Sequence, residues 1–250
     1  MSVGLYIVAE AMDFGGKSTA CKKLGAAIKA RVTAEPFNET PESKAFKAKL
    51  VSNTMTKDEE IQGFGTARVE AFQKVIGPYL KHGRDVISDR NFITSMVYQS
   101  DDQVSMSEIF QFNKKLLKTY GFDLLPDLVI FIDIDHETFL VRLDKAIKEG
   151  REINAKDLMF KDKEVFDLYR NKYLRCLDYL VDRYKVNVQI LKPEETGVEN
   201  LLEIVNQRKS LDKLKNNVRS IDNKESIDKV RSFLVEKIGD VVTRLRKETA

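Results

Sequence analysis

The chain has 250 residues, of which 42 are basic and 39 acidic, and its formal net charge is +3. This balance excludes the strongly basic surface of a nucleic-acid-binding protein, and the apolar runs are too short for a membrane span. The cysteines, Cys21 and Cys176, and the histidines, His82 and His136, lack the spacing of a disulfide framework or a zinc site. No basic region followed by an apolar stretch opens the sequence, so we expect a reduced, cytoplasmic compartment.

Short apolar runs rich in β-branched residues alternate along the chain with longer segments of helical periodicity. The runs predict buried strands at residues 5–9, 85–88, 128–134 and 186–191, and a further short strand ends just before Glu35. The pattern of residues 57–81 predicts a helix between two of these strands. Such alternation favours an α/β fold in which a parallel sheet has helices on both faces. Ligands of such folds bind beyond the carboxyl ends of the strands.

The C-terminal third contains two strand–turn–helix patterns, and either could supply the last strand of the sheet. We favour residues 186–191 over the copy at residues 216–238, because the first apolar run is stronger. This choice predicts a main domain of residues 1–208 and a charged helical extension of residues 209–250.

The segment "AEAMDFGGKST" follows the first strand and reproduces the phosphate-binding pattern G-x-x-x-x-G-K-[ST], with Ala11 at the first glycine. Gly15 and Gly16 would let backbone N–H groups face phosphate oxygens at the positive end of the next helix. Lys17 would reach the β- and γ-phosphates, and the Ser18 hydroxyl would bind Mg²⁺. Alanine adds only a methyl group, so we expect the loop to tolerate it if the backbone there keeps a negative φ.

Later stretches provide candidates for binding an acceptor molecule. Asp89 and Arg90 stand at the carboxyl end of a predicted strand, where charged residues are hard to explain as core, although a surface ion pair is an alternative. Phe64 and Arg68 lie four residues apart on one helix face, where a ring could cover a base and a guanidinium could grip a phosphate. A half-buried helix contact explains that pair equally. Glu35 precedes a proline and a loop.

Taken in order, "AEAMDFGGKST", "TAEPFNETP", "GFGTARVEAF", "SDRNFITSMVYQ" and "PDLVIFIDIDHETFLVRL" resemble the thymidylate kinases over roughly residues 3–192. The resemblance implies a three-layer P-loop kinase fold with a central parallel five-stranded sheet. It implies transfer of the ATP γ-phosphate, with Mg²⁺, to a deoxynucleoside monophosphate, first of all dTMP. A homodimer is the assembly that the family suggests.

Matching positions give the donor side its residues. ATP would bind at Phe14, Gly15, Gly16, Lys17, Ser18 and Thr19. The metal residues would be Ser18 and Asp89, the latter through the hydration shell of the ion. The catalytic residues would be Asp13, Lys17, Arg90 and Arg151.

Matching positions also give the acceptor side its residues, which are Asp13, Glu35, Phe64, Arg68, Arg90, Ser95, Tyr98 and Gln99. Phe64 would stack on the base, and Ser95 and Gln99 would face its edge. Arg68 and Arg90 would hold the acceptor phosphate. Asp13 would orient the acceptor near its sugar, and Tyr98 would crowd the 2′ position.

The transferring phosphate needs one more cation, because charge accumulates on its equatorial oxygens. Some members of the family have an arginine inside the phosphate loop, but here Phe14 and Gly15 occupy the corresponding positions. We therefore expect a basic lid at about residues 142–160, with Gly150 as its hinge and Arg151 as the first choice to reach the phosphate. The other basic candidates there are Arg142, Lys145 and Lys148.

Outside the phosphate loop, three positions depart from the family pattern, and all concern the acceptor. Ala34 replaces an arginine, Ala67 replaces an acidic or amide residue, and Asn91 replaces tyrosine or histidine. Another acceptor, such as dUMP or a 5-substituted deoxyuridylate, therefore stays open. A deoxynucleoside kinase would need a base for a 5′-hydroxyl, whereas Arg68 and Arg90 favour a monophosphate. A degenerate nucleotide-binding protein is a further alternative, against which the intact lysine, serine and aspartate of the loop argue.

Overall fold

The computed structural model describes residues 4–52 and 54–219. Five strands form one sheet in the order β2-β3-β1-β4-β5, and every neighbouring pair is parallel. Their bounds are β1 Tyr6–Ala11, β2 Arg31–Ala34, β3 Val86–Asp89, β4 Leu128–Ile132 and β5 Val188–Leu191. The predicted parallel five-stranded sheet is confirmed, and the predicted strand of residues 186–191 supplies β5. Residues 220–238 of the later copy lie outside the described residues.

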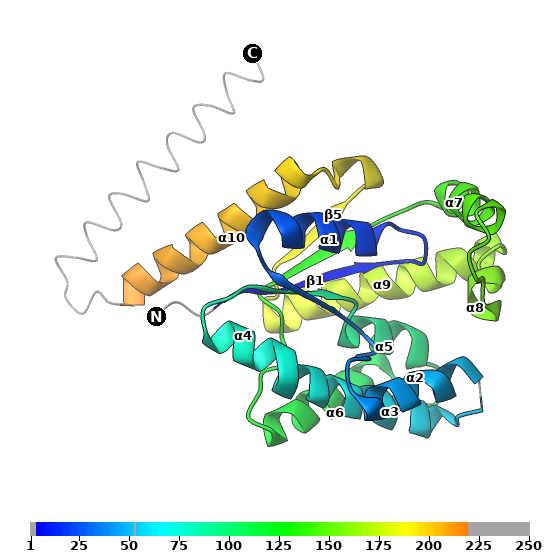
Figure 1. Ribbon diagram of the computed structural model, residues 1–250, viewed down its shortest axis with the longest axis horizontal. Helices are drawn as coiled ribbons and strands as arrows, with labels where there is room; N and C mark the ends of the chain where they lie inside the picture. Colours follow the sequence, from blue (N-terminus) through cyan, green and yellow to red (C-terminus); the bar gives the residue numbers. More distant parts are fainter. Residues whose placement is uncertain (1–3, 53, 220–250) are drawn as a thin grey trace, which may run out of the picture. The chain divides into compact units, whose positions relative to one another are not determined.

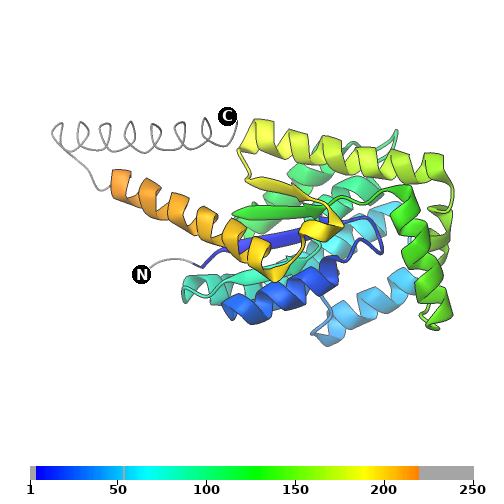
Figure 2. The ribbon, with the colours of Figure 1, turned by 90° about the horizontal axis from the view of Figure 1, so that it is seen from above.

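Helices cover both faces of this sheet (Figure 1). Their bounds are α1 Lys17–Ile28, α2 Pro41–Ser52, α3 Lys57–Ala71, α4 Gly77–Lys81, α5 Phe92–Gln99, α6 Met106–Thr119, α7 His136–Lys148, α8 Ala155–Met159, α9 Lys163–Tyr184 and α10 Val198–Arg219. Figure 2 shows the strands between α1 on one side and α9 on the other. The strands β1 and β4 are buried along their whole length, which explains their nearly continuous apolar sequence.

The helix predicted over residues 57–81 is present, with one local change of winding. A capping box of Thr56 and Glu59 begins it, and a π-helical turn, η1 Phe72–Ile76, joins α3 to α4. Pro78 follows this turn at the start of α4. Because proline lacks a backbone N–H and clashes with the carbonyl four residues before it, a regular α-helix is unfavourable at this point, and the wider turn absorbs the misfit.

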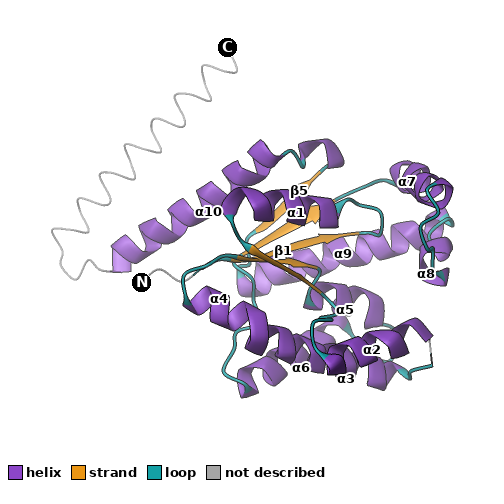
Figure 3. Cartoon of the chain, viewed as in Figure 1, coloured by secondary structure: helices purple, strands orange, loops and turns teal. Residues whose placement is uncertain are grey.

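Because β3 and β4 both pair with β1 in parallel, the carboxyl ends of these three strands lie at the same edge of the sheet. Figure 3 shows the strands in orange, with loops leading from them into the surrounding helices. β1 runs into α1 through residues 12–16, and β3 runs into α5 through Arg90 and Asn91. These two strand-to-helix connections are adjacent, because Ala9 of β1 pairs with Asp89 of β3. The topology therefore brings the predicted phosphate loop next to the predicted acceptor residues.

The chain divides into two compact units, residues 1–202 and residues 203–250. The predicted boundary after residue 208 falls within α10, and residues 220–250 of the predicted extension lie outside the described residues. The division into a kinase domain and an extension therefore stays a prediction. Both cysteines are free and buried. Of the helices in the described ranges, none has the length and apolar character needed to cross a membrane.

Candidate active site

The loop between β1 and α1 has the backbone shape of a tight anion-binding turn. Gly16 has a φ of 92° and Phe14 a φ of 61°, both in the left-handed region. Gly16 suits that conformation because it has no Cβ, whereas the same conformation strains Phe14. α1 starts directly after Gly16, so its free N–H groups point toward the loop.

Ala11 fits this loop, as expected, and Gly15 is the reason. Ala11 is fully buried at the end of β1 and is not among the described residues with a positive φ. A Cβ placed on Gly15 would lie 2.5 Å from the Ala11 Cβ, a distance that side chains do not adopt. The loop therefore has room for the methyl group of Ala11 only because position 15 carries none.

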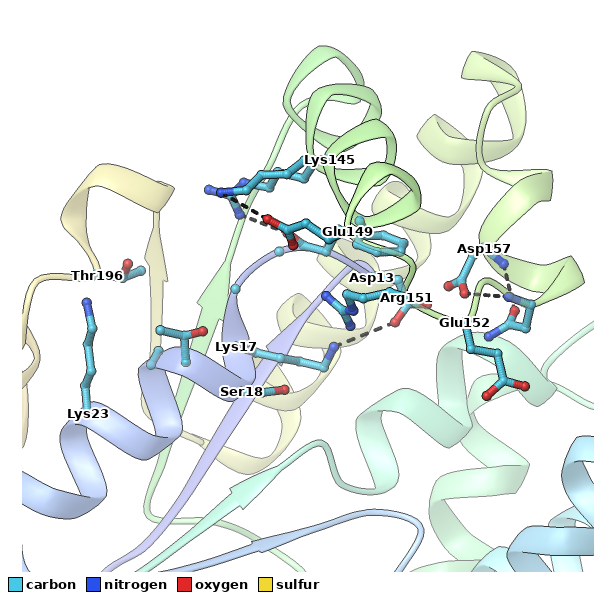
Figure 4. Close-up of a pocket in the computed structure, with 18 residues that line it drawn as sticks. Asp13, Lys17, Ser18, Lys23, Lys145, Glu149, Arg151, Glu152, Asp157 and Thr196 are labelled. Atoms are coloured by element: carbon cyan, nitrogen blue, oxygen red, sulfur yellow. Dashed lines mark hydrogen bonds and ion pairs between the residues drawn. The ribbon is translucent and has the colours of Figure 1, made fainter.

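A cavity of about 710 Å³ lies over the loop (Figure 4). Its walls come from the loop, α1, α7, the lid and the turn before α10. The residues lining it are Asp13, Phe14, Gly15, Gly16, Lys17, Ser18, Thr19, Ala20, Lys23, Arg142, Lys145, Ala146, Glu149, Arg151, Glu152, Asn154, Asp157 and Thr196. The six residues predicted to bind ATP therefore face one cavity, together with basic side chains from the lid, whereas Asp89 and Arg90 are not among its lining residues.

The carboxylate of Asp13 joins the two sides of the site. Lys17 Nζ lies 3.7 Å from Asp13 Oδ1, and the Arg90 guanidinium pairs with the same oxygen. The Tyr98 hydroxyl donates to the other oxygen at 3.4 Å. Burial would raise the pKa of Asp13, but Arg90 and Lys17 outweigh it and hold the pKa below its ordinary value. Asp13 is therefore an anion held between Lys17, which follows the glycines of the loop, and Arg90, which directly follows β3.

Arg90 owes its position to an unusual backbone. Its φ is 73°, in the left-handed region, and its N–H donates to the Ala9 carbonyl at 3.0 Å. Burial would lower the pKa of Arg90, but Asp13 reverses the effect and raises it well above its ordinary value. A strained residue held in place by its surroundings is typical of a functional position.

Ser18 and Asp89 lie together at the floor of the site. The Ser18 hydroxyl donates to Asp89 Oδ2, and Asp89 Oδ1 is buried with no hydrogen-bond partner in the described chain. A hydroxyl and a carboxylate are the hard oxygen ligands that Mg²⁺ prefers. The described residues contain no cluster of three or more His, Cys, Asp or Glu side chains for a metal. The pair thus fits an ion that keeps water and phosphate oxygens among its ligands.

Arg68 is more deeply buried than a free phosphate ligand would be, with only 1% of its surface exposed. Nε and Nη2 donate to the two carboxylate oxygens of Glu35, at 2.8 and 2.5 Å. The guanidinium also donates to Ser95 Oγ at 3.0 Å and to Asn113. Burial raises the pKa of Glu35, and Arg68 opposes the rise. The pair is bidentate, and its charges offset each other.

Of the predicted base-binding residues, Ser95 contacts Arg68 directly, and Phe64 and Gln99 have surroundings of their own. The half-buried Phe64 is contacted edge-on by the ring of Phe46, with 5.2 Å between ring centroids. Gln99 is 4% exposed, yet both polar atoms of its amide have no hydrogen-bond partner among the residues described. Buried amides are almost always paired, so Gln99 is a strong candidate for contact with a bound molecule.

The lid approaches the loop through two arginines. Arg142 Nη1 donates to the Phe14 carbonyl at 2.9 Å, and the Arg151 guanidinium lies 5.5 Å from the centre of the Phe14 ring. Gly150, next to Arg151, has a φ of 71°, and the Arg151 N–H donates to the Ala146 carbonyl at 3.0 Å, as in a glycine cap at the end of a helix. The role of Gly150 as a hinge stays a prediction. Arg142 therefore contacts the loop backbone directly. The sequence offered it only as one of several basic candidates in this segment.

One buried residue escaped the sequence analysis. Glu10 is fully buried in β1 and accepts from the backbone N–H groups of Asn91 at 2.9 Å and Thr94 at 3.3 Å, and from the Thr94 hydroxyl at 2.7 Å. Burial raises its pKa to about 7, although Arg90 opposes the rise. A lone carboxylate inside an apolar strand was the signal that could have revealed it.

Known proteins of similar sequence and fold confirm the predicted resemblance. The thymidylate kinase family model matches residues 10–200. A thymidylate kinase of Buchnera aphidicola is 29% identical over 197 residues, which cover 75% of this chain and 88% of the relative. One from Bacillus cereus is 27% identical over 213 residues, which cover 82% and 98%.

The likeness extends to three-dimensional structure. The crystal structure of thymidylate kinase from Ehrlichia chaffeensis superposes with a TM-score of 0.59 at 19% identity. The match covers 81% of this chain and 99% of that one, and it supports the P-loop kinase fold. With the family model covering most of its length, the chain belongs to the thymidylate kinase family.

Proposed function

We propose that the protein transfers the γ-phosphate of ATP to dTMP, giving ADP and dTDP. The observation that carries this proposal is the pairing of Lys17 and Arg90 with one oxygen of Asp13. Lys17 belongs to the donor side, and Arg90, directly after β3, belongs to the acceptor side. Two phosphate groups repel each other, so a site that brings cations together from both sides favours their approach.

On the donor side, the N–H groups of residues 15–19 bind the phosphates of ATP, and Lys17 contacts the β- and γ-phosphates. Ser18, with Asp89 acting through water, would hold Mg²⁺, whose chemistry is to neutralise the phosphate oxygens and to orient them. The oxygen ligands and the unpartnered Asp89 oxygen support this assignment. Arg151 of the lid supplies the additional positive charge at the transferring phosphate.

On the acceptor side, Phe64 stacks on the base, and Ser95 and Gln99 face its edge. The unpartnered amide of Gln99 supports that role. Asp13 orients the sugar, and Tyr98 beside it favours deoxyribose.

The two arginines of the acceptor side divide their work unequally. Arg90 is the main ligand of the acceptor phosphate. Arg68, whose charge Glu35 offsets, contributes through its N–H groups beside Ser95 more than through net charge.

The family resemblance also supports a homodimer in the cytoplasm. A 5-substituted deoxyuridylate is the second candidate acceptor, because Ala34 at the end of β2 is exposed and offers no cation beside Asp89, its neighbour in the sheet. A nucleoside acceptor is the third possibility, which requires no phosphate clamp.

The test is ADP formation with ATP and Mg²⁺ against a panel of nucleoside monophosphates, with thymidine and deoxycytidine as unphosphorylated acceptors. We expect dTMP to be preferred, and Arg90→Ala to raise the KM for dTMP at least ~10-fold, since the variant loses a charged hydrogen bond. Arg183→Ala, which removes an exposed arginine of α9, is the matched control. Preference for another monophosphate would reassign the substrate, and turnover of nucleosides alone would refute the clamp.

A further inference from the structure

Phe14 stands where some members of this family have an arginine, and both its ring and its carbonyl contact α7. Its ring packs edge-on against Phe139 of α7, with 5.7 Å between centroids and 71° between planes. Its carbonyl accepts from Arg142 of the same helix at 2.9 Å. Ring and backbone are thus both attached to α7, which fixes the direction in which the ring faces.

The face of this ring receives Arg151. The guanidinium lies 5.5 Å from the ring centre, within the range of a cation–π contact. Arg151 is exposed and, within residues 4–52 and 54–219, its side chain makes no hydrogen bond or ion pair. A long side chain with several rotatable bonds is costly to order. The Phe14 ring is therefore a contact that restrains the guanidinium, in addition to the attraction between Arg151 and the Asp157 carboxylate.

The Phe14 ring is supported by a series of packed aromatic rings. Phe139 contacts Phe160 at the end of α8, with 6.0 Å between centroids, and Phe160 contacts Tyr98 of α5 at 6.2 Å. Phe139 and Phe160 are both fully buried. The Tyr98 hydroxyl then reaches Asp13, the residue before Phe14. This closed circuit of contacts joins the loop, α7, the lid and the acceptor helix α5.

We propose that Phe14 is a positioning residue that holds Arg151 over the phosphate loop through the face of its ring. Position 14 carries no charge itself, but its ring would hold the positive charge of Arg151, a lid residue, near the transferring phosphate. This inference rests on the proposed function, since it assigns Arg151 to the transferring phosphate. The side chain needed at position 14 is an aromatic ring and not merely an apolar group of similar size.

Steady-state kinetics with ATP, Mg²⁺ and dTMP test the proposal. Phe14→Leu keeps an apolar side chain but removes the ring face, so we expect kcat to fall roughly 2- to 30-fold, the range of one cation–π contact, with little change in the KM for dTMP. Phe14→Tyr should keep most of the activity. Phe14→Leu should have no further effect once Arg151→Met is present, because the ring then has nothing to position. Arg183→Met is the control.

Equal losses from Phe14→Leu with and without Arg151→Met would overturn the proposal, because the ring would then act through packing alone. Failure of Phe14→Tyr to restore kcat would overturn it as well.

A second readout does not depend on catalysis. The chain contains no tryptophan, so Phe14→Trp introduces a single fluorophore at the proposed contact. We expect acrylamide to quench its emission more strongly when Arg151→Met is added, since the guanidinium no longer covers the ring. Identical quenching would overturn the contact. A wild-type protein inactive toward dTMP would instead refute the proposed function, and the quenching comparison would then decide the contact by itself.

Discussion

Gly15→Ala tests how the loop accommodates the alanine at its first position. The added methyl would lie 2.5 Å from the Ala11 Cβ and 2.9 Å from the Met12 carbonyl oxygen. Both distances are shorter than any that side chains adopt, and both neighbours are buried. The loop must therefore shift, and overpacking of this kind costs about 1–3 kcal/mol. We expect the free energy of unfolding to fall by about that amount.

The partner substitution makes the test specific. Ala11→Gly removes a fully buried methyl, worth about 0.8 kcal/mol, and adds backbone freedom in a strand, worth about 0.5–1 kcal/mol. If the two methyl groups compete for one space, the losses in the free energy of unfolding should not add. The double variant Ala11→Gly/Gly15→Ala should lose at least ~1 kcal/mol less than the sum of the two single losses, because it removes the clash with the Ala11 Cβ. Recovery should be partial, because the contact with the Met12 oxygen remains.

Urea unfolding followed by far-UV circular dichroism measures all four proteins of this cycle, and the KM for ATP reports the shape of the loop. We expect Gly15→Ala to raise that KM and the double variant to lower it again. Additive losses, or an unchanged stability of Gly15→Ala, would show that the loop adapts freely and that the two positions are independent.

Three buried side chains that can carry a charge, Lys17, Glu35 and Glu10, give a testable expectation each. Lys17→Met should abolish ADP formation while thermal unfolding stays cooperative, because the loop loses its cation; a measurable fraction of wild-type kcat would contradict its role. Glu35→Gln should lower the free energy of unfolding by about 3–5 kcal/mol in urea titrations, since it leaves the Arg68 charge unpaired in the interior. Glu39→Gln, in a far more exposed pair, should cost about 1 kcal/mol or less. The folded pKa of Glu10, about 7, exceeds its ordinary value of 4.5, so the folded state binds more protons between these values. Stability should therefore fall as pH rises from about 4.5 to 7 and then level off, and Glu10→Gln should remove this part of the pH dependence; an unchanged profile would refute the assignment.

The sheet could be predicted from the sequence because strands buried on both faces have continuous apolar runs, as β1 and β4 do. The loop could be predicted because its chemistry is local: a strand, two glycines, a lysine and a helix are consecutive in the chain. The π-turn before Pro78 could not, since proline only makes a regular helix unfavourable and the packing around it selects the alternative.

Contacts between distant segments account for what the sequence did not reveal. Phe64 and Arg68 were placed on one helix face by their spacing, but Glu35, 33 positions from Arg68, determines how much of the arginine charge is free. The ion pair of Glu35 and Arg68 depends on where the chain after β2 lies relative to α3, which no local sequence pattern specifies. The same holds for Arg142, whose contact with the loop spans 128 positions.

The departures from the family pattern fall into two kinds with different consequences. Inside the loop, Gly15 accommodates the methyl of Ala11, and the ring of Phe14 faces Arg151. In the proposed mechanism these two positions keep the charges around the donor phosphates and concern how the reaction is carried out. At the end of β2 the situation differs, because Ala34 provides no cation and the arginine of that strand, Arg31, pairs with Glu39. Because no other residue of β2 replaces the positive charge missing at Ala34, the acceptor phosphate should be bound more weakly. We therefore expect this chain to differ from its relatives in acceptor affinity and specificity more than in the transfer step.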